Sequence, residues 1–576
     1  MLRKLLSLGI AMLAAALTAC SDGTGGSEVS PGNGAQGTLI FNPPLRVVTI
    51  TAADLTAQLS ATPTGQQLLQ IAGTPTCGID VHYIQYGTID GSTAGGVSPG
   101  LTTASGALMV PTGPAPACSG PRPMLLYAHG TAVDRTTNLA NVPNNTEGTL
   151  IAAMFAAQGF IVIAPNYAGY DSSPLQYHPF LNGDQQSQEM IDALRAGRTA
   201  LGKIPASSTT EAPGLLFLTG YSQGGYVAMA AAKAMQAQQG ADPSLTVTAL
   251  AAMSGPYALE AFGDMVVFGG VNLGATAFLP MLATSYQHQF GNIYNSPNDT
   301  SNVFEPHYTA LGPVDAILPS NTPFSTLVST GRLPQLGVFS STAPTGTCND
   351  PFFAANTPFT GGTPQQNALF ALGFTPNAGD PSVNLIVNTL RRDVVCDAFL
   401  HPDGAFPTPT AGVPLAAAPA HPVRQATKHN DMRTWHPTPG PTPEPVLLCG
   451  GGNDPTVFFP TNTGTMAGTG ASGSTPPNHA GTFWDAEATA GLVRVLDVDT
   501  AVLTAPNSPD GFDPLRVGFA AAKTATAQAA IAAGATDGGA AAVTQAYHGT
   551  LVPPFCSKAT QGFFAQILIS ISFPYP

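Results

Sequence analysis

The chain carries the pentapeptide Gly-Tyr-Ser-Gln-Gly at residues 220–224, directly after the apolar run 215–219 and directly before a helical pattern at 225–239. A serine at such a sharp turn between strand and helix has a strained backbone, with its hydroxyl raised above the sheet. The glycines beside Ser222 let the strand and the helix approach closely. The first amides of the helix would face any negative charge beside the serine. The chain is therefore restricted to folds that contain this strand–turn–helix unit.

Short apolar runs and helical patterns alternate around this turn. The apolar runs occupy residues 124–128, 160–164, 215–219 and 247–253, and the helical patterns occupy residues 150–158, 188–201 and 225–239. Earlier, residues 80–114 alternate polar and apolar side chains, as in 82–86 and 107–110, which predicts antiparallel strands. Apolar strands that alternate with helices are typical of a parallel sheet covered on both faces. The sequence thus predicts an α/β fold, in which sites lie at the carboxyl ends of the strands.

The alternation stops after residue 253 and resumes only with the apolar run 446–449. The stretch between has helical patterns at 365–370 and 382–392 and proline-rich pieces, so we interpret it as an insertion. The remainder predicts a helix over residues 517–533 and a last strand over residues 541–547. This organisation predicts the segments 1–19, 20–38, 39–256, 257–443 and 444–576, of which 39–256 and 444–576 form one core.

The amino-terminal segment predicts export from the cytoplasm. Two basic residues precede the apolar run 5–17, which is shorter than the ~20 residues of a membrane span but suits a signal peptide. The sequence Leu-Thr-Ala-Cys that ends at Cys20 resembles the lipobox of bacterial lipoproteins. The resemblance implies that residues 1–19 are removed and that lipid on Cys20 anchors the protein to a membrane, the outer one where the host has two. Residues 21–37 would be a flexible tether; secretion after cleavage without lipidation is the alternative.

Composition excludes several classes of function. The chain has 19 basic and 33 acidic residues, so its formal net charge of −14 is the wrong sign for neutralising nucleic-acid phosphates. Hydrophobic residues make up 44% of the chain, too many for an intrinsically disordered protein. It contains neither the HExxH pattern of zinc enzymes nor the glycine-rich GxxxxGK[ST] and GxGxxG patterns that bind phosphates. We therefore expect no metal, no cofactor and no nucleic-acid partner.

Six of the 7 cysteines remain when Cys20 is set aside, an even number in a chain predicted to be exported. Disulfides persist outside the cytoplasm, and the spacing fits neither a metal knuckle nor a CxxC redox motif, so we expect up to three bridges. About fifteen connectivities are possible. Pairing neighbours along the chain joins Cys77 to Cys118, Cys348 to Cys396, and Cys449 to Cys556.

The turn at residues 220–224 resembles the nucleophile elbow of the α/β-hydrolase fold. The resemblance implies a mostly parallel, eight-stranded sheet flanked by helices, a nucleophile at Ser222, and an acid and a histidine that follow it in that order. A serine hydroxyl is a poor nucleophile near neutral pH unless a neutral imidazole takes its proton and a carboxylate orients that imidazole. The chain after Ser222 must supply both groups.

Asp454 and His548 are the candidates for these two groups. Asp454 follows the apolar run 446–449 and three glycines, which places it at the carboxyl edge of the predicted sheet. His548 directly follows the predicted last strand. The alternatives are Asp485, Asp497 and Asp499 for the acid, while His479 lies in a loop and His401, His421, His429 and His436 lie in the insertion. Without catalysis, Asp454 would cap a turn and His548 would be a structural histidine.

An oxyanion next to the serine needs two hydrogen-bond donors, and the first candidate is the backbone N–H of Gln223. The loop after the run 124–128 begins His129-Gly130-Thr131 and resembles the oxyanion loop of many esterases and lipases. The third residue of that loop gives its amide, so the resemblance implies Thr131 as the second donor. His129 would hold the loop through hydrogen bonds.

Three further runs, 166–171, 177–181 and 192–196, are similar to runs in secretory lipases and their bacterial relatives. The similarity is clear over residues 120–255, and beyond them it rests on the acid and histidine motifs. A large insertion after the sixth strand forms a lid in that family, so the resemblance implies a partly helical lid over 257–443. The HGT oxyanion loop departs from the acidic version of the family.

These residues and resemblances predict an exported serine hydrolase that cleaves carboxylic esters of hydrophobic substrates through an acyl-enzyme on Ser222. A peptidase of the same fold is one alternative, although the HGT sequence lacks the HGGPG-like loop usual in secreted proline-directed peptidases. A binding lipoprotein that kept the fold and lost its activity is another.

Overall fold

The structure, a computed structural model, describes residues 34–204, 207–270, 272–314, 317–334, 337–339, 384–405, 410–437, 444–467, 482–500 and 511–571. The predicted signal peptide and Cys20 lie outside these ranges. The end of the predicted tether is described, and the Gly37 N–H donates to the Gly87 carbonyl at 2.9 Å. Within the ranges given above, no helix has both the length and the apolar character needed to cross a membrane.

In the part of the chain that the structure describes, a nine-stranded sheet has the order β1-β2-β3-β5-β4-β6-β7-β8-β9. The strands are β1 (Leu45–Ile50), β2 (Gly78–Ile89), β3 (Leu101–Thr112), β4 (Gly120–Ala128), β5 (Ile161–Pro165), β6 (Thr209–Tyr221), β7 (Ala249–Met253), β8 (Val446–Gly450) and β9 (Val493–Asp497). Neighbouring strands from β5 to β9 are parallel, whereas β1, β2 and β3 join the sheet through antiparallel pairs. The predicted α/β fold with a mostly parallel sheet is confirmed.

The expected number of eight strands is wrong, because β1 and β9 were not predicted. Most side chains of β1 are exposed at the edge of the sheet, including Leu45 and Val47, so this strand lacks a recognisable alternation of buried and exposed positions. The last strand expected over residues 541–547 is also wrong. That segment forms helix α17 (Ala540–Ala546), which agrees with its three consecutive alanines, the best helix formers.

Helices cover both faces of the sheet. Successive side chains of a strand point to opposite faces, so neighbouring residues of one strand pack against different helices. In β6, Leu216 and Leu218 pack in a cluster with α4 (Gly183–Leu201) and α5 (Gln223–Gln238), whereas Phe217 packs in a cluster on the other face. The second cluster contains side chains of α1 (Ala52–Ser60), α2 (Pro63–Ala72), α3 (Thr146–Met154), α16 (Asp513–Ala532) and α18 (Val552–Ser570). The four helices predicted for the core are therefore present, with shifted ends.

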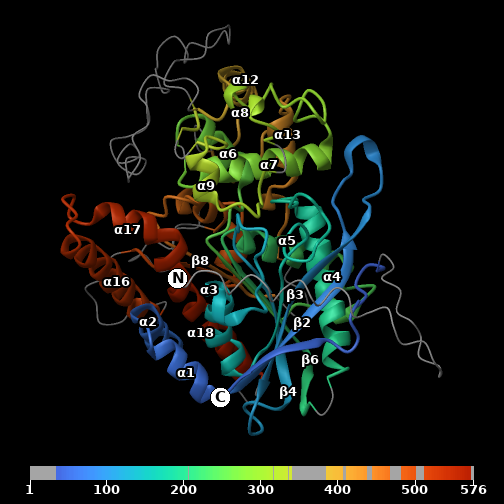
Figure 1. Cartoon of the computed structure of the whole chain (residues 1–576), viewed down its shortest axis with the longest axis vertical. Coiled ribbons are helices and arrows are strands. Elements are labelled where there is room, and N and C mark those ends of the chain that lie inside the picture. Colours follow the sequence, from blue (N-terminus) through green and yellow to red (C-terminus); the bar gives the residue numbers. More distant parts are fainter. Residues whose placement is uncertain are drawn as a thin grey trace, which may run out of the picture. The chain divides into compact units, whose positions relative to one another are not determined.

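The described part of the predicted insertion is partly helical, as expected. Its helices are α6 (Leu259–Val267), α7 (Ala275–Phe290), α8 (Pro306–Ala310), α9 (Phe324–Ser329), α12 (Asn388–Leu400) and α13 (Pro422–His429), which gather at the top of Figure 1. The buried Arg424 of α13 joins three of them, because it pairs with Asp264 of α6 at 2.8 Å and with Asp397 of α12 at 2.9 Å. Helix α12 overlaps the helix predicted over 382–392, and the one predicted over 365–370 lies outside the described residues.

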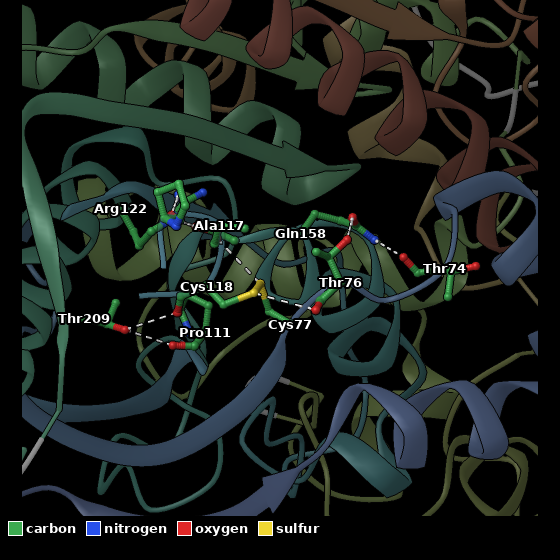
Figure 2. The surroundings of a disulfide bond; sticks show 11 residues. Thr74, Thr76, Cys77, Pro111, Ala117, Cys118, Arg122, Gln158 and Thr209 are labelled. Atoms are coloured by element: carbon green, nitrogen blue, oxygen red, sulfur yellow. Dashed lines mark hydrogen bonds between the residues drawn. A yellow bond between two sulfur atoms is a disulfide. The ribbon is translucent and has the colours of Figure 1, made fainter. Parts of the chain in front are cut away.

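The predicted disulfide between Cys77 and Cys118 is present and joins the residues that precede β2 and β4 (Figure 2). Beside it, the Thr209 hydroxyl lies 3.0 Å from the Pro111 carbonyl and 3.4 Å from the Cys118 carbonyl. Since β2 and β4 both begin at this edge, the bridge fastens the amino edge of the sheet.

The predicted disulfide between Cys449 and Cys556 is also present, and it joins β8 to α18 near the carboxyl edge. Cys348 lies outside the described residues, so its pairing with Cys396 stays a prediction. The two bridges thus lie at opposite edges of the sheet.

Candidate active site

The turn between β6 and α5 holds Ser222 in a strained conformation, with φ of 58° and ψ of −123°. The Ser222 N–H donates to the Met253 carbonyl at the end of β7, at 2.9 Å. A Cβ atom added to Gly224 would lie 2.0 Å from the Ala128 carbonyl oxygen, and one added to Gly220 would lie 2.2 Å from the Gly224 carbonyl oxygen. Glycine is therefore required on both sides of the serine, as expected from the pentapeptide.

The structure brings the three residues singled out for the serine, acid and histidine into one hydrogen-bonded chain. The His548 Nε2 atom lies 2.8 Å from Ser222 Oγ, and His548 Nδ1 lies 2.6 Å from Asp454 Oδ2. The three side chains are buried but not sealed, with 8% of Ser222, 4% of Asp454 and 9% of His548 exposed. In a neutral imidazole whose Nδ1–H donates to the carboxylate, Nε2 is the acceptor that faces the serine hydroxyl.

Backbone amides hold the Asp454 carboxylate in the orientation that His548 needs. Its Oδ1 atom accepts from the N–H groups of Thr456 and Val457 at 2.9 and 3.1 Å, which leaves Oδ2 for the imidazole. A Cβ atom added to Gly451 would lie 2.6 Å from the Tyr547 hydroxyl oxygen, and one added to Gly452 would lie 2.3 Å from Asp497 Oδ2, so glycine lets these side chains pack against the loop that carries Asp454.

The alternative acids have other partners. Asp497 accepts from the Gly452 N–H at 2.7 Å, and Asp499 accepts from the Tyr547 hydroxyl at 2.6 Å. Asp485 begins the short helix α15 (Asp485–Thr489). Asp497 and Asp499 therefore support the loops on which Asp454 and His548 lie.

His548 lies in the π-helical turn Tyr547–Leu551, between α17 and α18, and not after a strand as expected. The Tyr221 hydroxyl donates to the His548 carbonyl at 2.5 Å and so joins this turn to the residue before Ser222. The bridge from Cys449 to Cys556 ties α18, which continues this turn, to the strand that precedes the acid loop.

The two residues predicted to supply amides to an oxyanion line the same cavity as Ser222. Thr131, Gln223 and Ser222 all line one cavity of about 120 Å³. Among the described residues, neither the Thr131 N–H nor the Gln223 N–H donates to a backbone carbonyl. Both amides are therefore free to bind an oxygen atom that carries negative charge.

Sequence reasoning missed Glu147, which anchors the oxyanion loop. Its Oε1 atom accepts from the Gly130 N–H at 2.9 Å and from the Tyr127 hydroxyl at 2.8 Å. His129 holds the same loop, as expected, because its Nδ1 lies 2.6 Å from the Gly130 carbonyl and its Nε2 lies 3.0 Å from the Asn166 carbonyl. A glutamate in the first turn of α3 is an ordinary helix-start residue, so no local signal marks its role.

The cavity beside Ser222 is apolar and belongs in large part to the helices of the predicted insertion. Its walls include Phe180, Leu259, Phe262, Phe278, Leu282 and Val423. Helices α6, α7 and α13 supply most of these side chains, so they cover the space next to the serine hydroxyl. Within the described residues, no group of three histidine, cysteine, aspartate or glutamate side chains is arranged to hold a metal ion.

Comparisons with known proteins show what the chain is similar to. Residues 134–290 match the secretory lipase family. Among solved structures, a ligand-bound form of the rice cell wall degrading esterase LipA from Xanthomonas oryzae is similar, with 21% identity, a TM-score of 0.57, and 92% of this chain and 98% of that chain covered. A hydrolase from Legionella pneumophila is similar over the same shares, with 17% identity and a TM-score of 0.52. No curated protein sequence matches the chain at a significant level.

The structural matches, at these identities, establish the α/β-hydrolase fold. The two disulfides indicate a protein that works outside the cytoplasm.

Proposed function

Because the chain has the α/β-hydrolase fold and is related to lipases and esterases, we propose that it is an exported serine hydrolase that cleaves carboxylic esters through an acyl-enzyme on Ser222. The observation that carries the proposal is the continuous contact from Ser222 through His548 to Asp454, with distances of 2.8 and 2.6 Å. Such a contact lets the imidazole take the serine proton while the carboxylate stabilises the resulting imidazolium.

In the proposed reaction, Ser222 Oγ attacks the ester carbonyl carbon as its proton passes to His548 Nε2. The oxyanion of the tetrahedral intermediate accepts hydrogen bonds from the Thr131 and Gln223 N–H groups. When the intermediate collapses, His548 returns the proton to the departing alcohol, and the acyl group stays on Ser222. Water, deprotonated by the same nitrogen, then attacks the acyl-enzyme, and the acid leaves as His548 returns the proton to Ser222 Oγ.

We infer that the apolar cavity takes the acyl chain and that the insertion is a lid over it. The observation that supports this inference is that Ser222 lines the same cavity as aromatic and aliphatic side chains of α6 and α7. A hydrophobic ester gains free energy when its acyl chain leaves water for such a wall. A peptide does not generally carry a long apolar chain next to its scissile carbonyl, as a hydrophobic ester does. We therefore favour the esterase over the peptidase.

The test of this activity is Ser222→Ala, assayed with a chromogenic ester and with a fluorophosphonate probe. Turnover and labelling should both fall to background, and Ser60→Ala, an exposed serine of α1, should keep both. Wild-type turnover in Ser222→Ala would overturn the proposed function. An unlabelled wild-type protein without turnover would point instead to a binding protein that has lost activity.

The proposal includes a lipid anchor on Cys20, which rests on the lipobox resemblance. Cys20→Ser should move the protein from the membrane fraction to the soluble fraction of its host and leave its ester turnover unchanged. A wild-type protein found only in the soluble fraction would contradict the anchor and would leave the esterase proposal intact.

A further inference from the structure

His178, in the loop between β5 and α4, contacts the residue that follows Ser222. Its Nδ1 lies 2.9 Å from the Ala168 carbonyl, and its Nε2 lies 2.6 Å from Gln223 Nε2. A carbonyl oxygen only accepts, so Nδ1 carries the proton and Nε2 accepts a hydrogen bond from the Gln223 amide. His178 is 1% exposed, and so is Gln223. The bond between them is therefore shielded from water.

The backbone at Gln223 needs such an anchor because the preceding residue is strained. Ser222 has a φ of 58°, and a residue in that region costs about 1–3 kcal/mol unless its surroundings hold it. The Ser222 N–H is fixed by the Met253 carbonyl, and the Ser222 carbonyl accepts from the Gly225 N–H at 2.9 Å. The His178 contact adds a third anchor. It holds the side chain of Gln223, the residue whose backbone N–H is a proposed oxyanion donor.

The same loop also holds the other proposed donor. The Tyr167 ring stacks on the His129 ring with centroids 4.1 Å apart, and its hydroxyl donates to the His129 carbonyl at 3.1 Å. The Tyr170 hydroxyl donates to the Ala132 carbonyl at 2.6 Å. These two carbonyls lie on either side of Thr131. His178 stacks against Tyr167 at 5.5 Å, so one aromatic cluster contacts both the Gln223 side chain and the carbonyls that flank Thr131.

The backbone of this loop is itself strained, since Tyr167 has a φ of 68° and Leu181 has a φ of 54°. Non-glycine residues with positive φ cluster at functional sites, where the surrounding structure over-determines them. The strain at both ends of the segment that carries His178 is a second sign that its position is specified closely.

We propose that His178 is a positioning residue that holds Gln223, and through Tyr167 the oxyanion loop, so that the Gln223 and Thr131 N–H groups converge on one oxygen atom. This inference rests on the proposed function, because it concerns the oxyanion of that reaction. Burial lowers the pKa of His178 to about 3, so the ring remains a hydrogen-bond acceptor at the pH values at which the protein would act.

Two variants remove the bond and put a side chain of similar shape in each place. His178→Phe keeps a ring against Tyr167 but cannot accept, and Gln223→Met keeps the length of the side chain but cannot donate. Because the two backbone donors remain present and only lose an anchor, we expect kcat for a chromogenic ester to fall about tenfold, less than the roughly 100-fold or greater loss when a donor is removed. KM should change little, because the contact matters most when charge develops on the oxygen.

Three further measurements separate positioning from a general loss of structure. The double variant His178→Phe/Gln223→Met should be no slower than the slower single variant, since each single variant already breaks the bond between His178 and Gln223. Affinity for a trifluoromethyl ketone, which forms a tetrahedral oxyanion on the serine, should fall in parallel with kcat. His82→Phe, a buried histidine on β2 four strand positions from β6, should keep wild-type kcat.

The proposal is overturned if either single variant keeps wild-type kcat and ketone affinity, or if the two losses multiply in the double variant. It is also overturned if kcat falls while ketone affinity stays unchanged, since the donors would then still converge. Each outcome is distinct from failure of the esterase proposal, which would appear as wild-type turnover in Ser222→Ala.

Discussion

At the scale of single residues, the proposed chemistry depends on the orientation of one carboxylate. Asp454 accepts two backbone N–H bonds on Oδ1 and presents Oδ2 to His548. In Asp454→Asn, an uncharged amide can no longer stabilise the imidazolium, and it favours the wrong imidazole tautomer. We expect kcat to fall roughly 10³–10⁴-fold with a nearly unchanged melting temperature, as measured by ester turnover and thermal unfolding.

Asp485→Asn is the matched control for this prediction, because Asp485 is an acid that the sequence left open and that lies at the start of α15. Its turnover should equal that of the wild type. Equal losses in the two variants would show that Asp454 acts through stability and would remove it from the mechanism.

The residues of the site differ in how far the sequence could predict them. Ser222, Asp454 and His548 were predicted because a known turn motif fixes the first and the chain order restricts the other two. The roles of Glu147 and His178 could not be predicted in this way. Each acts through contacts with residues distant in the chain, Glu147 with Gly130 and His178 with Gln223. No local pattern of residue types marks such contacts.

At the scale of secondary-structure elements, the structure brings His548 to Ser222 and Asp454 although the element expected before it was wrong. The expected last strand is helix α17, and β9 was missed. The apolar residues of 541–547 suit either structure, and a short apolar run does not distinguish a strand from a helix. The position of His548 after Ser222 and Asp454 in the chain survived this error because chain order does not depend on the element type.

The bridge from Cys449 to Cys556 connects the elements that carry the acid and the histidine. In the double variant Cys449→Ser/Cys556→Ser, α18 and β8 lose their covalent link, so the distance between Asp454 and His548 should vary more. We expect a loss of stability of about 2–4 kcal/mol together with a lower kcat at temperatures where the protein remains folded. Denaturant unfolding and ester turnover measure the two effects.

Cys77→Ser/Cys118→Ser provides the comparison, because that bridge fastens the opposite edge of the sheet. It should lower stability and leave kcat close to the wild-type value. If the two double variants lose kcat to the same degree, the position of the Cys449 bridge has no special effect on the site.

At the scale of the whole molecule, buried charges in the insertion make stability depend on pH. Burial raises the pKa of Asp264 to about 6, and burial together with the nearby Asp403 raises the pKa of Glu260 well above its usual range. A carboxyl whose folded pKa is raised binds its proton more tightly in the folded state. Its contribution to stability is present at low pH and is lost as the pH rises from the unfolded pKa through the folded pKa.

We therefore expect the free energy of unfolding to fall as the pH rises above about 4, the unfolded pKa of an aspartate, with the Asp264 part lost by about pH 6. Glu260 should extend the fall to higher pH. In Glu260→Gln, which cannot ionise, denaturant unfolding measured between about pH 5 and about pH 8 should show a weaker decline than the wild type. Parallel curves for the two proteins would contradict the assignment.

The arrangement of the insertion was beyond sequence reasoning, although its boundaries and partly helical character were expected. Its helices are held by pairs that are far apart in the chain, such as Arg424 with Asp264. Its proline-rich connections and its few charged residues show no periodic apolar pattern from which the packing of one helix against another could be predicted. Only the three-dimensional contacts reveal that α6 and α7 enclose the cavity next to Ser222.

The size of this cavity leads to a prediction on acyl-chain length that also tests the proposed lid. Gly263 of α6 lines the cavity, and a Cβ atom added to it would meet only the Thr427 Cγ2 atom, at 3.7 Å. Gly263→Ala should therefore be tolerated and gain up to about 1 kcal/mol of stability from the better helix propensity of alanine. Gly263→Leu adds a branched side chain that the cavity of about 120 Å³ can accept only by losing space for substrate.

In a series of chromogenic esters from short to long acyl chains, Gly263→Leu should keep turnover of the shortest ester and lose kcat/KM progressively as the chain lengthens. Gly263→Ala should follow the wild type throughout, because its methyl group makes only an ordinary contact. The difference between the two variants isolates volume from helix stability, since both remove the same glycine. A uniform loss across the series in Gly263→Leu would show that the acyl chain binds elsewhere, and the helices of the insertion would then cover the serine without forming the acyl site.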